Sequence, residues 1–74
     1  MDEFQCWFQD ETVAEHVFAV NASRAAERYA ERRERTGYVW VRRHEYSVDS
    51  PSIRFHVMTR TVKAYIAHIS EVPE

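Results

Sequence analysis

The spacing of apolar residues changes partway along the chain. From Val13 to Val20 the sequence has the character of an extended strand. After Asn21, small apolar residues recur at helical spacing: Ala22, Ala25, Ala26, Tyr29 and Ala30. A second β-type run begins at Tyr38. A strand, a helix and a strand in this order predict an α+β architecture.

The N-terminal residues predict a hairpin. Phe4, Cys6 and Phe8 occupy every second position between residues 3 and 9, which is the period of a strand. Residues 10–12 are polar and suit a tight turn. We therefore expect the strand at 13–20 to fold back and pair with the first strand.

The helix is expected from about Ala22 to about Arg35, with its alanine-rich stripe against the sheet. Asn21 is a suitable N-cap, because its side chain can accept a free backbone amide of the first helical turn. Gly37 is expected to be the C-terminal stop.

The C-terminal half predicts a second hairpin, with strands at 38–48 and from 53 to about 59 around a turn at 49–52. Pairing Val48 with Ile53 places seven side chains on the face expected to receive the helix: Tyr38, Trp40, Tyr46, Val48, Ile53, Phe55 and Val57. The opposite face would carry Val39, Val41, Arg43, Glu45, Arg54, His56 and Met58, joined by Trp7 or Val17, and would stay partly exposed. A slip of one residue would exchange these faces.

Residues 61–72 fit both helical spacing and strand alternation, and the preceding threonines favour a strand. Together these segments predict one domain, residues 1–74, with an antiparallel sheet of four to five strands and one helix packed on one face. The predicted element order is ββαββ.

Charge and composition limit the classes of function to be expected. Twelve acidic and ten basic residues give a net charge of −2, which argues against broad electrostatic capture of nucleic acid. Nine of the ten basic residues are arginines, a preference found at interfaces and also in proteins of GC-rich genomes. The sequence shows a lone cysteine, no secretion signal and no apolar run near the ~20 residues that span a bilayer, so we expect a soluble, cytoplasmic protein without membrane contact.

Catalytic and metal-binding motifs are not found. No glycine-rich turn precedes the helix, so the common nucleotide-binding loops are excluded. Cys6 lies mid-strand between apolar neighbours and is expected to be buried and inert. The four histidines, at 16, 44, 56 and 68, lack the close spacing of zinc motifs. We expect neither an enzyme, nor a metal site, nor a cofactor.

Two binding functions remain. Arginines near Tyr38 and Trp40 could stack single-stranded bases, but the net charge opposes this and the aromatic residues are expected to be needed in the core. A partly apolar sheet face rimmed by Arg and Glu instead favours protein binding, either to a foreign partner or in a homodimer. The first function is kept as the alternative: a small nucleic-acid-associated regulator.

The stretch from Val17 to Ala30, followed by Gly37 to Val41, resembles small ββαββ proteins encoded by phages and mobile elements. Some of these are anti-CRISPR proteins, which act without catalysis by occupying the surface of a host complex. The resemblance implies an inhibitor in a bacterial host that binds a protein or ribonucleoprotein complex; direct nucleic-acid binding is not expected. Candidate contacts are Arg24, Arg28, Arg32, Arg42, Arg43, Glu45 and Arg54. A second resemblance, to the flavin-storing βαββ protein dodecin, is poorer because two strands are expected before the helix.

Overall fold

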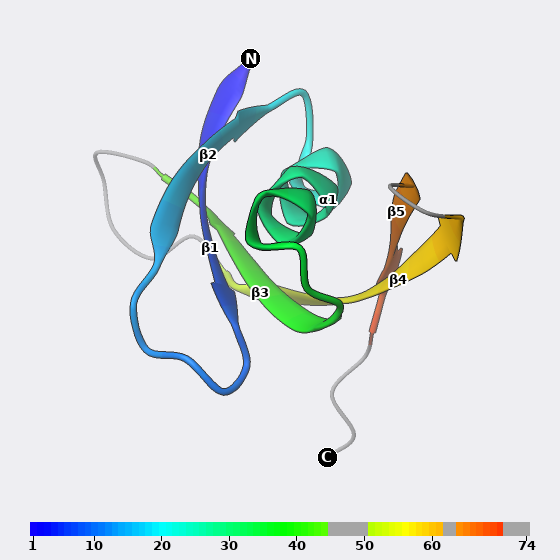
Figure 1. Ribbon diagram of the computed structural model, residues 1–74. Helices are drawn as coiled ribbons and strands as arrows, with labels where there is room; N and C mark the ends of the chain where they lie inside the picture. Colours follow the sequence, from blue (N-terminus) through cyan, green and yellow to red (C-terminus); the bar gives the residue numbers. More distant parts are fainter. Residues whose placement is uncertain (45–50, 62–63, 71–74) are drawn as a thin grey trace.

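The computed structural model describes residues 1–44, 51–61 and 64–70, which form one helix and five strands (Figure 1). The elements in chain order are β1 (Asp2–Phe8), β2 (Glu15–Ala19), α1 (Ala22–Arg33), β3 (Gly37–Arg43), β4 (Ile53–Thr61) and β5 (Ala64–Ile69). The predicted α+β class and the hairpin of β1 and β2 are confirmed. The ambiguous C-terminal segment forms a strand, so the order is ββαβββ.

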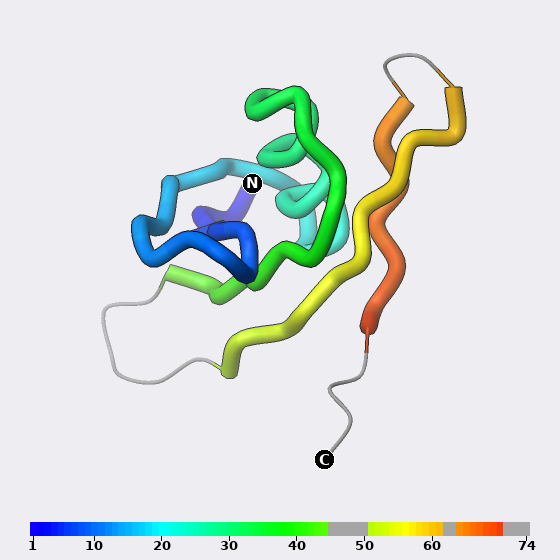
Figure 2. The backbone as a smooth tube through the Cα atoms, turned by 60° about the horizontal axis from the view of Figure 1, so that its bottom comes forward, coloured from blue at the N-terminus to red at the C-terminus, as the bar shows by residue number. Residues whose placement is uncertain are grey.

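The five strands form one antiparallel sheet in the order β2-β1-β3-β4-β5. The sheet curves around α1, which contacts all five strands. Figure 2 shows α1 between the β1–β2 hairpin on one side and the β4–β5 hairpin on the other. One face of the sheet is therefore covered by the helix, and we call the other the open face.

The core lies between α1 and the sheet. It consists of alternate strand residues and the predicted alanine stripe with Tyr29: Phe4, Cys6, Phe8, Val17, Ala19, Ala25, Ala26, Tyr29, Ala30, Val39, Val41, Phe55 and Val57. The small alanines let the helix backbone approach the strands. Two large buried rings, Phe8 and Tyr29, pack against each other in the core with their centroids 5.0 Å apart.

The helix begins as predicted and ends earlier. The Asn21 side chain accepts a hydrogen bond from the backbone N–H of Arg24 at 2.8 Å. The last helical residue is Arg33, and Glu34 closes the helix in the left-handed conformation with φ 51°. Gly37 is not the stop that was predicted; it is the first residue of β3 and has φ 138°, where a side chain would be strained.

The predicted faces of β3 are wrong. Val39 and Val41 point into the core and are 0% and 1% exposed, whereas Tyr38 is 41% exposed. The cause is the register, because Ile53 pairs with Val41 rather than with residue 48. A shift from 48 to 41 is odd, so every β3 side chain changes face. Residues 46 and 48 lie outside the described part of the chain.

The other predicted assignments to the two faces have different outcomes. Val17 is fully buried against α1, so it is a core residue and not part of the exposed face. Ile53, at the start of β4, is 39% exposed, although Phe55 and Val57 on the same strand face the helix as predicted. Met58 is 43% exposed, which agrees with its predicted place on the uncovered face.

Candidate binding face

Strand alternation defines the open face. Alternate side chains of β1 to β4 join the core, Tyr65 and Ala67 of β5 pack against it, and the residues between them point away from α1. The open face carries Glu3, Gln5, Trp7, His16, Phe18, Tyr38, Trp40, Arg42, Arg54, His56, Met58, Ile66 and His68. Within the described part of the chain, no helix or strand lies over this face.

Two tryptophans lie at the middle of the open face. Trp7 of β1 is directly opposite Trp40 of β3, and both side chains are partly exposed. They are the only tryptophans in the sequence. The sequence predicted that Tyr38 and Trp40 would face the helix, but the aromatic side chains buried in the core are Phe4, Phe8, Tyr29 and Phe55. Both tryptophans are therefore left partly exposed to solvent.

Two arginines flank the tryptophan pair. Arg42 donates a hydrogen bond from Nε to Gln5 Oε1 at 3.0 Å, and its guanidinium carbon lies 5.7 Å from the Trp7 ring centre. Arg54 is directly opposite Trp40 in the β3–β4 pair. These positions place a positive charge on each side of the rings, within the distance range of cation–π attraction for Arg42.

Arg54 also belongs to a stack of planar groups. Its guanidinium lies 4.6 Å from the Tyr38 ring centre, and the Tyr38 ring stacks on that of His56 with centroids 4.6 Å apart. Arg54 further donates to Gln9 Oε1 at 3.0 Å and to Ser70 Oγ at 3.2 Å. The guanidinium and the two rings are thus held in place before any partner arrives.

Charge is unevenly divided between the two faces of the sheet. The five strands contain three carboxylates, and two of them, Asp2 and Glu15, lie on the helix side. Only Glu3 among these strand residues lies on the open face, where its carboxylate pairs with the His16 ring. Among the described strand residues, positive groups on the open face therefore exceed negative ones, although the net charge of the chain is −2.

All four histidines lie on the open face or beside it. His16 and His44 form an edge-to-face pair with centroids 5.1 Å apart, and His56 pairs with His68 across β4 and β5. Within residues 1–44, 51–61 and 64–70, no group of three His, Cys, Asp or Glu side chains is placed to hold a metal ion.

Three predicted contact residues lie elsewhere, on the outer surface of α1. Arg24, Arg28 and Arg32 line an open groove of about 720 Å³ beside β5, together with Glu27, Glu31, Ala64 and Tyr65. Two of them are engaged within the chain: Arg24 pairs with Glu27 at 3.3 Å, and Arg32 with Glu15 at 3.6 Å. The mixed charges of this groove largely cancel.

Of the remaining two candidates, only Arg43 lies within the described residues, and it belongs to neither surface. Arg43 ends β3 on the helix side, where it pairs with Asp2 at 2.7 Å and lies over the Phe4 ring. Glu45 lies outside the described residues. Of the six predicted contact residues that the structure describes, Arg42 and Arg54 are the two that lie together on the open face.

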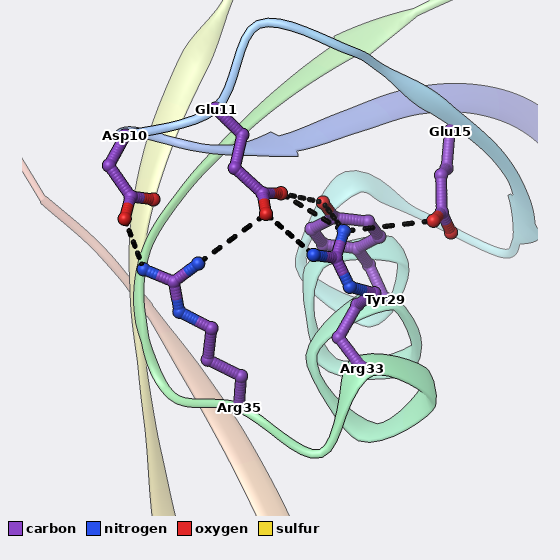
Figure 3. Close-up of polar contacts among 6 residues, drawn as sticks. All are labelled: Asp10, Glu11, Glu15, Tyr29, Arg33 and Arg35. Carbon is purple, nitrogen blue, oxygen red and sulfur yellow. Dashed lines mark hydrogen bonds and ion pairs between the residues drawn. The ribbon is translucent and has the colours of Figure 1, made fainter.

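A polar cluster fastens the connection between β1 and β2 to the end of α1 (Figure 3). The Glu11 carboxylate accepts hydrogen bonds from the Tyr29 hydroxyl at 3.1 Å and from both terminal nitrogens of Arg33 at 3.0 and 2.5 Å. Arg35 pairs with Asp10 at 2.7 Å and with Glu11 at 3.6 Å. Every member is satisfied by another, which is the pattern of a structural clamp.

The pKa shifts of the nucleophilic and acid–base groups agree with a structural role. The hydrogen bond from Arg33 lowers the pKa of Glu11, and that from Arg35 lowers the pKa of Asp10. Burial, aided by the bond to Glu11, raises the pKa of Tyr29 to about 12. Burial likewise raises the pKa of the Cys6 thiol to about 12, so the predicted burial of Cys6 is confirmed and its reactive thiolate is disfavoured.

Sequence reasoning placed Trp40 on the wrong face, whereas Trp7, one of the two alternatives for the partly exposed face, lies there. The alternation in β1 contained the signal, because Trp7 is out of phase with Phe4, Cys6 and Phe8. If those three residues face the helix, Trp7 must face away from it. The matching assignment of Trp40 needed the β3–β4 register, which the predicted turn at 49–52 set incorrectly.

Comparisons with known protein families, with curated proteins and with solved structures find no match to this chain. Among the described residues, no helix combines the length and the apolar character needed to cross a bilayer.

Proposed function

We propose that this protein is a non-catalytic binding module that contacts a macromolecular partner through its open face. The observation that carries the proposal is the pair of partly exposed tryptophans, Trp7 and Trp40, on a sheet face that the described helix does not cover. Tryptophan and arginine are the residues that most often dominate binding energy at interfaces. Trp7, Trp40, Arg42 and Arg54 supply both types within one patch.

The pKa shifts of Cys6 and Tyr29 support a mode of action without catalysis. The groups with the strongest pKa shifts are Cys6 and Tyr29, and both shifts favour the protonated, unreactive form. Such groups support the core and the clamp rather than proton transfer. The proposed action is therefore occupation of a surface.

The resemblance to small phage-encoded proteins gives this proposal a setting. It implies a chain that acts in the cytoplasm of a bacterial host and occludes a host defence complex made of protein and RNA. The open face suits that role because it offers aromatic contact area and positive charge without requiring a movement of the fold.

Affinity capture from a bacterial lysate tests the use of this face. Arg42→Glu changes the open face, and Arg28→Glu makes the same change of charge on the outer surface of α1, so the two variants are matched. We expect Arg42→Glu to lose the captured partner and Arg28→Glu to retain it. Equal retention by both variants, or equal loss, would contradict the proposal.

A further inference from the structure

We propose that the open face binds single-stranded nucleic acid, with unpaired bases stacked on Trp7 and Trp40 and phosphates held by Arg42 and Arg54. The inference rests on the proposed function, because it names the partner of the same face. The sequence had led us to expect no direct nucleic-acid binding, for two reasons. The aromatic residues were expected to be needed in the core, and the net charge of the chain is negative.

The tryptophan pair supplies the stacking surface. Residues directly opposite each other on antiparallel strands have their Cβ atoms about 4.5–5.5 Å apart, so Trp7 and Trp40 are close neighbours on the open face and each can offer its ring to a base. Every base has a flat face that can stack on such a ring, and paired bases inside a duplex cannot present it. The patch therefore favours single strands over double strands.

The arginines are placed to hold the backbone of a strand lying across these rings. Arg54 is the cross-strand neighbour of Trp40, and Arg42 lies beside Trp7. Arginine presents several N–H donors in one plane, which suits phosphate oxygens. The single carboxylate on these strands that shares the face, Glu3, is already paired with His16. On the described strands, a polyanion thus meets more attraction than repulsion.

A second copy of the chain is a poorer occupant. In a twofold dimer the same patch meets itself, so Arg42 and Arg54 of one copy would approach those of the other. The open face offers them only the carboxylate of Glu3 on its strands. Burying like charges against each other is unfavourable, whereas a nucleic acid brings the missing negative charge.

An acidic polypeptide would satisfy the arginines and leave the rings unused. Its carboxylates could pair with Arg42 and Arg54, but its side chains offer no flat surface for Trp7 and Trp40. Binding that uses the tryptophans as well as the arginines therefore distinguishes a nucleic acid from an acidic polypeptide. Polyglutamate is therefore the appropriate competitor in the test.

Intrinsic fluorescence reports on this site directly, because both tryptophans of the protein lie on the open face. The purified protein is titrated with oligo(dT) and with oligo(U) of about 12 nucleotides, a length within the range that small domains occupy. We expect saturable quenching with both strands. We expect little quenching with a duplex of equal length or with polyglutamate.

Three variants locate the binding. Trp40→Leu removes one ring, keeps an apolar side chain and leaves Trp7 as reporter; we expect affinity to fall roughly 5- to 150-fold. Arg42→Glu should weaken binding and reduce the slope of log affinity against log salt by about 0.7 for each phosphate that the variant no longer neutralises. Arg28→Glu, the matched change on α1, should keep the wild-type affinity. Circular dichroism confirms that each variant is folded.

Three results would overturn the inference: no quenching by either oligonucleotide at low salt, equal effects of Arg42→Glu and Arg28→Glu, or equal affinity for polyglutamate. The failure of this inference can be told apart from the failure of the proposed function. If capture from a nuclease-treated lysate depends on Arg42 while the oligonucleotides do not bind, the open face is a protein-binding surface and only the inference fails.

Discussion

At the residue scale, position on an alternating strand matters more than residue type. Trp7 and Phe8 are both large and aromatic, yet Phe8 is 1% exposed in the core and Trp7 lies on the opposite face. Cys6 and Gln5 divide in the same way. Whether a strand side chain can contact a partner therefore depends on which of the two alternating sets of positions it belongs to. The exposed set can be inferred from sequence only where the buried residues of the same strand are known.

Glu11 provides a prediction at this scale. Its pKa is lowered by Arg33 and Tyr29, so the ionised carboxylate stabilises the fold above the ordinary pKa of a glutamate. That contribution is lost as the pH falls through the lowered pKa of the folded state. We expect Glu11→Gln to lower the free energy of unfolding at neutral pH, and the difference from wild type to narrow at about pH 3.

Urea unfolding at the two pH values measures this effect. Glu31→Gln removes the same charge from the exposed surface of α1 and should leave stability nearly unchanged at both. If Glu11→Gln matches Glu31→Gln at neutral pH, the cluster around Glu11 does not stabilise the fold.

At the element scale, local signals predicted most of the structure. The β1 alternation, the Asn21 cap and the alanine stripe of α1 depend on neighbours in sequence, and all three are confirmed. The β3–β4 register depends on the length of a connection that local patterns did not determine. The predicted register differs from the observed pairing of Val41 with Ile53 by an odd number of residues, so the β3 residues were assigned to the wrong faces, whereas Arg54, His56 and Met58 of β4 were assigned correctly.

The Asn21 cap gives a prediction for α1. Asn21→Ala removes the acceptor for the Arg24 N–H and should lower the free energy of unfolding by about 0.5–2 kcal/mol. Asn21→Asp keeps an acceptor at the same place and should restore most of the stability. Thermal unfolding followed by circular dichroism distinguishes them; equal melting temperatures for wild type and Asn21→Ala would contradict this role of the cap.

At the scale of the whole molecule, the curved sheet separates two chemistries. The acidic residues of α1 and of the β1–β2 connection lie around the helix, where Glu11 and Glu27 bind groups of the same chain. The open face keeps Arg42 and Arg54 with the two tryptophans. A net charge computed from the sequence averages over both sides, and so it gave no indication of a face suited to a polyanion.

The account depends most on the claim that both tryptophans lie outside the core, beside positive charge. Quenching of tryptophan fluorescence in the free, folded protein tests it, with iodide and caesium as small ions of opposite charge. We predict that, relative to the quenching of free tryptophan by each ion, iodide quenches the native emission more strongly than caesium, because Arg42 and Arg54 attract the anion. Emission that neither ion quenches until the protein is unfolded would place the tryptophans in the core and contradict the account.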